Sequence, residues 1–168
     1  RLGAAVHLYP LDLQLVPRAV TVLLGATQAG KTTLMRVMAG LDKPSAGRVL
    51  ADGTDVTGMP VRERNVAMVF QQYSLYPHLT VRQNLAFPLR SPLSTLSPMQ
   101  IGQRVNEVAQ IPQIHHKLDN KATRLSGGEM QRVSIGRALV RNPSIYLMDE
   151  PLSSLDAKLR ADLRIELK

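Results

Sequence analysis

The sequence predicts an α/β fold in which helices cover a parallel sheet. Strand-like and helix-like segments alternate along most of the 168 residues. A glycine-containing loop joins an apolar run at 19–24 to a helical pattern that begins at Thr32, and a second apolar run at 145–148 ends in two acids. Parallel strands buried on both faces are typically continuous apolar runs connected to helices. We therefore expect one α/β domain over residues 1–168.

The first third of the chain is expected to be rich in strands. Residues 11–15 alternate leucine with polar residues, which is typical of a half-buried strand, and the apolar run that follows predicts a buried one. A helix is expected from Thr32 to Ala39, ended by Gly40 and Pro44. The strands expected in this part lie at 11–15, 19–24, 47–55 and 66–70.

The rest of the chain divides into a helical part and a return to α/β. Residues 72–125 carry five prolines with short helical patterns between them, which predicts a small helical subdomain inserted in the core. Val105, Val108 and Ala109 would share its buried face. The last elements expected are a helix at 128–140, a strand at 145–148 and a helix from about 157, where leucines recur every four residues. Both ends look cut, so we expect a piece of a longer protein.

Composition excludes several classes of function. Lys and Arg number 21 against 13 Asp and Glu, and this net charge of +8 favours polyanionic partners without choosing among them. The absence of cysteine excludes disulfides and thiolate metal sites. With six aromatic residues and no Trp, a base-stacking surface for nucleic acid is not expected. No apolar stretch is long enough to span a bilayer, so we expect no direct membrane insertion. The four histidines show no metal-ligand spacing.

A glycine-rich loop carries the main chemical signal, because residues 25–32 fit the pattern G-x-x-x-x-G-K-[ST] between a strand-like and a helix-like segment. Backbone N–H groups of such a loop and the following helix N-terminus bind phosphates. Lys31 is placed to reach the β- and γ-phosphates, and the Thr32 hydroxyl to ligate Mg²⁺. The predicted nucleotide-binding residues here are Gly25, Ala26, Thr27, Gln28, Ala29, Gly30, Lys31, Thr32 and Thr33.

Two acids follow the apolar run at 145–148. A buried parallel strand delivers its C-terminal residues to the ligand crevice of an α/β sheet. Asp149 could therefore hold Mg²⁺, directly or through water, and Glu150 could polarise an attacking water. Together with the glycine-rich loop, these acids predict nucleotide hydrolysis.

A second phosphate site is predicted at the start of the helix at 128–140. Ser126 is a candidate N-cap, and Glu129, three residues later, would complete a capping box. A capping box needs no tandem glycines, so Gly127 and Gly128 favour an additional role in phosphate binding.

The order of these motifs resembles the nucleotide-binding domain of ABC ATPases, the ATP-binding subunits of ABC transporters. Residues 71–81 and 149–160 resemble the importer subgroup for sugars and glycerol phosphate. The resemblance implies a RecA-like P-loop NTPase core with an antiparallel β subdomain and a helical subdomain, incomplete at the C-terminus. It also implies that Gln71 contacts Mg²⁺ and the attacking water. The expected catalytic residues are then Glu150, Gln71 and Lys31, and residues 153–156 form the D-loop.

The same resemblance implies cofactors and partners. ATP and Mg²⁺ would bind, and a second ATP-binding subunit would pair head to tail, so that the P-loop of one faces Ser126–Gly128 of the other. Permease subunits would dock on the helical region after Gln71, which would place the protein peripherally at the cytoplasmic face of the membrane. Departures from the family are Gln28 in place of Gly, Glu129 in place of the commoner Gln, and no aromatic near residues 2–3, where the adenine-stacking residue is expected; Tyr9 is a weak substitute.

Two alternatives within this resemblance stay open. A DNA-repair or chromosome-associated ABC ATPase is disfavoured because the interval between Gln71 and Ser126 holds no heptads and no cysteine. A non-catalytic regulatory subunit is disfavoured by the intact Lys31, Asp149 and Glu150. Outside this resemblance, a GTPase is disfavoured because residues 120–123 lack the Asp of an N-K-x-D motif.

Overall fold

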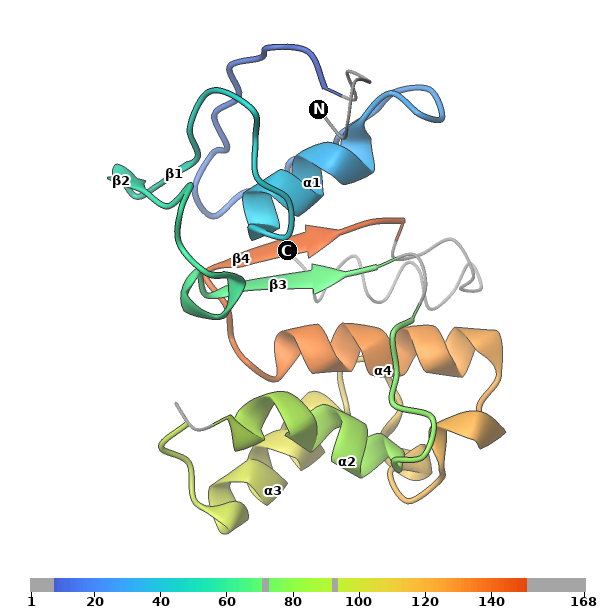
Figure 1. The fold of residues 1–168 in the computed structure, drawn as a ribbon. Coiled ribbons are helices and arrows are strands. Elements are labelled where there is room, and N and C mark those ends of the chain that lie inside the picture. The colour runs from blue at the N-terminus through green and yellow to red at the C-terminus, as the bar shows by residue number, and fades with distance from the viewer. Residues whose placement is uncertain (1–7, 71–72, 92–93, 151–168) are drawn as a thin grey trace. The chain divides into compact units, whose positions relative to one another are not determined.

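The computed structural model describes residues 8–70, 73–91 and 94–150. It divides into two compact units that separate after Val66, and each unit is described here by itself (Figure 1). The predicted helix from about 157, with its leucine repeat, lies outside the described residues.

The first unit contains helix α1 and a short hairpin. Helix α1 (Lys31–Ala39) follows the glycine-rich loop as predicted and ends at Gly40, whose φ of 80° is left-handed and whose N–H donates to Val37 O and Arg36 O. Such a left-handed glycine satisfies carbonyls that the last helical turn leaves without partners. A 3-10 turn, η1 (Val61–Glu63), closes the unit.

The strand predicted over 47–55 is two strands. β1 (Leu50–Ala51) and β2 (Thr54–Asp55) pair antiparallel, with Leu50 opposite Asp55 and Ala51 opposite Thr54. Asp52 and Gly53 both have positive φ, 49° and 78°. An Asp-Gly pair with two positive φ angles matches the twist of a two-residue hairpin, so the chain reverses where the sequence analysis continued it.

The strands predicted at 11–15 and 19–24 are wrong for the part of the chain that the structure describes, because both segments lack strand structure. Most of their apolar side chains are exposed, Val20 to 65% and Leu24 to 89%. An apolar run favours burial, but a strand exists only where its N–H and C=O groups find a partner strand. In the first unit the described ladder joins β1 to β2 instead.

Arg64 joins the end of α1 to the segment that follows the hairpin. Its guanidinium donates to Val37 O and Met38 O at 3.0 and 3.1 Å, to Met59 O at 3.1 Å and to Thr57 O at 2.9 Å. The residue is only 9% exposed. A cation at a helix C-terminus also complements the helix dipole. Arg64 therefore fixes the far end of the helix that the glycine-rich loop begins.

The second unit contains a two-stranded sheet backed by a helix. β3 (Val66–Val69) and β4 (Ile145–Met148) are neighbours and run in the same direction (Figure 1). Helix α4 (Gly127–Leu139) packs on them through Ile135 and Ala138, which share a core with Ala67 and Val69. The predictions of strands at 66–70 and 145–148 and of a helix at 128–140 are confirmed.

The described residues between β3 and α4 form short helices joined by turns and loops. The elements are α2 (Val81–Ala86), η2 (Phe87–Arg90), α3 (Pro98–Val108), η3 (His115–Lys117) and η4 (Ala122–Arg124). Val105, Val108 and Ala109 are buried as predicted, in one core with Leu85 of α2 and Val133 of α4. Within the described ranges, no helix is at once long and apolar enough to cross a membrane.

Candidate nucleotide-binding site

The glycine-rich loop turns sharply before α1. Ala29 N donates to Ala26 O at 3.2 Å, and Gln28 and Gly30 both have left-handed φ, 68° and 88°. Left-handed residues in a short loop turn successive N–H groups toward one side, which creates an anion-binding concavity. Gly30 then caps α1, so the positive end of the helix dipole points the same way.

Lys31 closes this loop with its side chain. The ammonium donates to Gly25 O and to Ala26 O, each at 2.8 Å. These are the first two residues of the motif, so the Lys31 ammonium lies over the concavity rather than away from it. A bound phosphate would compete for the same ammonium, which has three donors.

The residues predicted to hold Mg²⁺ have suitable donor chemistry. Thr32 offers a hydroxyl in the first turn of α1, and Asp149 offers a carboxylate just after β4. Hydroxyl and carboxylate oxygens suit a hard cation that keeps several waters and binds substrate phosphates. Thr32 belongs to the first unit and Asp149 to the second, so each candidate ligand is placed only within its own unit.

The acidic end of β4 is tied to β3 and to α4. Asp149 N donates to Val69 O at 2.9 Å, which extends the ladder to the first acid. Glu150 has a left-handed φ of 49°, and its carbonyl accepts from the Gln131 carboxamide at 3.4 Å. Gln131 is 3% exposed, and the sequence analysis assigned it no role. Its role depends on the acceptor that Glu150 O provides, and no local pattern in the sequence indicates that contact.

Ser126 caps α4 as predicted. Its Oγ accepts from Glu129 N at 3.3 Å, while Ser126 N donates to Glu129 Oε2 at 2.8 Å. This capping box fixes the start of a 13-residue helix whose first residue is Gly127. A Cβ added at Gly127 would lie 3.3 Å from the Tyr73 hydroxyl, so the glycine leaves room for that side chain.

Gln71 lies outside the described residues, as does the D-loop motif at 153–156. The segment just after Gln71 is held firmly. The buried Asn84 accepts from Tyr76 N at 2.9 Å and donates to Tyr76 O at 3.1 Å. Arg137 of α4 donates to Ser74 O and stacks on the Tyr76 ring, 4.9 Å from its centroid. Burial lowers the pKa of Arg137.

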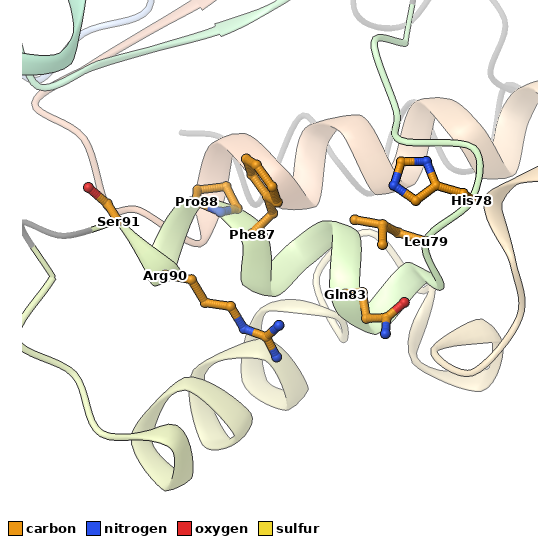
Figure 2. Close-up of a pocket in the computed structure, with 7 residues that line it drawn as sticks. All are labelled: His78, Leu79, Gln83, Phe87, Pro88, Arg90 and Ser91. Atoms are coloured by element: carbon orange, nitrogen blue, oxygen red, sulfur yellow. The ribbon is translucent and has the colours of Figure 1, made fainter.

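A pocket of about 570 Å³ opens beside this segment (Figure 2). Phe87 lies at its wall, 48% exposed, with its ring 4.4 Å from that of Tyr76. The residues that line the pocket come from the segment just before α2, from α2 itself, from η2 and from the residue after η2. They are His78, Leu79, Gln83, Phe87, Pro88, Arg90 and Ser91.

Comparison with known proteins follows the same motifs. A family model described as "ABC transporter" matches residues 8–153. The chain is 45% identical over 161 residues to the sn-glycerol-3-phosphate import ATP-binding protein UgpC of Cereibacter sphaeroides, covering 96% of this chain and 46% of the relative. It is 45% identical over 172 residues to the trehalose/maltose import ATP-binding protein MalK of Thermococcus litoralis, covering 99% and 46%. The chain thus spans less than half the length of these relatives.

Solved structures agree with the fold. The dimeric structure of MJ0796, a bacterial ABC transporter cassette, matches with a TM-score of 0.77 and 31% identity, covering 84% of this chain and 65% of that one. A post-hydrolysis state of the same cassette, bound to ADP and Pi, matches with a TM-score of 0.78. The predicted α/β fold of a P-loop ATPase is confirmed. Because the family model covers most of the chain and the identities are high, this chain belongs to the ABC transporter family.

Proposed function

We propose that the chain is the nucleotide-binding part of an ATP-hydrolysing subunit that powers an ABC importer. The observation that carries this proposal is the cradle at the start of α1, where Gln28 and Gly30 turn the loop and Lys31 lies over it. The order of motifs and the matched importer subunits support the same activity. Sugars or glycerol phosphate are the proposed transported solutes, by analogy with the relatives.

The proposed chemistry is positioning and charge neutralisation. Residues 25–33 bind the phosphates of ATP, and Lys31 neutralises charge on the β- and γ-phosphates. Thr32, Asp149 and Gln71 are the proposed ligands of Mg²⁺, which supplies charge neutralisation when bound. The Glu150 carboxylate orients and polarises the attacking water, and Gln71 contacts that water.

We propose that two such subunits pair head to tail, so that Ser126, Gly127 and Gly128 of one complete the ATP site of the other. The capped start of α4 supports this role, because the first N–H groups of a helix have no acceptor within the helix. The dimeric cassette with similar structure supports pairing in general.

The pocket bounded by Phe87 is the proposed docking site for a permease subunit at the cytoplasmic face of a membrane. Its size suits an inserted side chain or helix end, and its exposed ring offers apolar area for contact. Asn84 and Arg137 hold the adjoining segment, so the pocket wall is well supported. We propose no nucleic-acid partner.

The test of the proposed function is ATP hydrolysis by the full-length protein and its Lys31→Ala variant. The wild type should release phosphate from MgATP, and Lys31→Ala should abolish turnover and weaken ATP binding. Lys43→Ala, which removes a charge from the exposed segment beyond α1, is the matched control and should hydrolyse ATP normally. Equal turnover by Lys31→Ala and wild type would refute the role of the loop.

A further inference from the structure

The start of α4 carries an ionised carboxylate that is bound on both sides. Glu129 Oε2 accepts from Ser126 N at 2.8 Å, and Glu129 Oε1 lies 3.2 Å from the ammonium of Lys117. The backbone hydrogen bond from Ser126 is the main cause that lowers the pKa of this carboxyl, and Lys117 lowers it further. A negative charge therefore stands one turn from Ser126 at neutral pH.

The cap itself does not require this charge. Two other helices of the chain begin with the same reciprocal pair and use a neutral amide in the third position: Thr80 with Gln83 before α2, and Ser97 with Gln100 before α3. A neutral carboxamide is therefore sufficient to accept the N-cap N–H in such a box, although a carboxylate also interacts favourably with the helix dipole. The charge of Glu129 is thus not required for capping, and its effect on a phosphate at this place has to be considered separately.

Lys117 comes from a separate element and is held in place by its backbone. It ends the turn η3 (His115–Lys117), where its N–H donates to Ile114 O at 3.0 Å and its carbonyl accepts from Asn120 N at 2.9 Å. Ile114 and Leu118 on either side of the turn are buried. The Lys117 side chain is 31% exposed and that of Glu129 21%, so the pair is partly shielded from water.

A carboxylate without a counter-charge at this place would oppose the binding of a polyphosphate. Ser126 Oγ accepts from Glu129 N, which leaves its hydroxyl proton able to donate to a phosphate oxygen. Unit charges about 8 Å apart, at an effective dielectric constant of about 40, interact strongly enough to change binding about fivefold. A lysine ammonium within 4 Å of the carboxylate cancels most of that field.

We propose that Lys117 is a positioning residue for the ATP reaction: it neutralises Glu129 so that the start of α4 can receive the terminal phosphate of ATP. This inference rests on the proposed function, because it assigns Ser126 to a phosphate site. The assigned role of Lys117 is an electrostatic effect on ATP binding, which is separate from any effect on the stability of α4.

The test is a cycle of four full-length proteins: wild type, Lys117→Met, Glu129→Gln and the double variant. Lys117→Met should raise the KM for ATP about fivefold at low salt, with kcat changed much less. In the Glu129→Gln background, the same Lys117→Met change should leave the KM unaltered. The rise in KM caused by Lys117→Met should be smaller at about 0.5 M salt, because salt screens partly exposed charges.

Lys121→Met is the matched control. Lys121 is exposed and lies four residues from Lys117, so its loss changes the net charge of the same region equally. It should change the KM less than twofold, whereas an equal rise would make the effect one of general charge and overturn the proposal. The proposal would also be overturned if Lys117→Met raised the KM equally in the wild type and in the Glu129→Gln variant.

A second readout separates this inference from the proposed function. The ATP concentration for half-maximal dimerisation, followed by gel filtration, should shift with Lys117→Met in the same pattern as the KM. A wild type that neither hydrolyses ATP nor dimerises refutes the proposed function and this inference together. A wild type that does both, with an indistinguishable Lys117→Met variant, refutes the role of Lys117 alone.

Discussion

Replacing Arg64 by alanine should loosen the end of α1 that lies opposite the glycine-rich loop. Arg64 donates to four carbonyls. One of them, Val37 O, keeps a second donor in the N–H of Gly40, so among the described residues three carbonyls receive their hydrogen bond from the guanidinium alone. At about 1 kcal/mol for each partly buried carbonyl left without a donor, Arg64→Ala should cost the first unit about 3 kcal/mol.

Hydrogen exchange of the full-length protein measures the free energy of opening at the amides of α1, where the loss of Arg64 should act. Amides of α1 that exchange through opening of the first unit should exchange about a hundredfold faster in Arg64→Ala, since 1.4 kcal/mol is a factor of about ten. Arg62→Ala is the matched control, because its side chain is 76% exposed and, within the described ranges, forms an ion pair only with the neighbouring Glu63. Exposed pairs contribute little, so exchange should change less than about twofold. Equal acceleration in the two variants would refute the reasoning.

Four further outcomes are expected. Gly40→Ala should destabilise the protein, because the residue has a φ of 80° and a Cβ there would lie 2.5 Å from Arg64 Cζ; in urea unfolding its cost should be smaller when Arg64 is already alanine, and strict additivity would contradict the contact. Gln28→Gly should raise the melting temperature by the equivalent of about 0.5–1 kcal/mol, since relief of about 1–2 kcal/mol of left-handed strain exceeds the added chain entropy; a lower melting temperature would show that the side chain stabilises the loop. Folding lowers the pKa of Glu129, so its contribution to stability is present above the unfolded value and lost as pH falls, and Glu129→Gln should flatten the acid side of the urea midpoint measured from about pH 6 to pH 3. Glu150→Gln in the full-length protein should bind ATP and dimerise by gel filtration yet hydrolyse it very slowly, and wild-type turnover would reassign the catalytic base.

The elements that the sequence predicted correctly carry their own local signals. Helix α1 has a glycine at each end, and α4 begins with a serine and an acid three residues apart. Strands β3 and β4 are short apolar runs with a helix to cover them. Local chemistry of this kind is sufficient to specify where an element begins and ends.

The errors have two causes, a strand that finds no partner and a turn signal inside a strand-like segment. The apolar run at 19–24 was expected to be buried, yet Val22 is 69% exposed. The strand expected over 47–55 contains Asp52 and Gly53, a turn signal that was available in the sequence and outweighs the strand pattern around it. Of the candidate site, the motif residues were evident from spacing. Gln131, Arg64 and Asn84 were not, because a buried polar side chain is recognised only once its backbone acceptors or donors are in place.

Helix α4 has a consequence for how two ATP sites could communicate. Ser126 caps its start, and Gln131, five residues on and about 7 Å along the axis, holds the carbonyl of Glu150. In the proposed head-to-tail pair, the first of these residues serves the partner's nucleotide and the second supports the catalytic end of the chain's own site. One rigid helix would then transmit a change at either nucleotide to the other, so hydrolysis should depend cooperatively on ATP concentration, with a Hill coefficient above one.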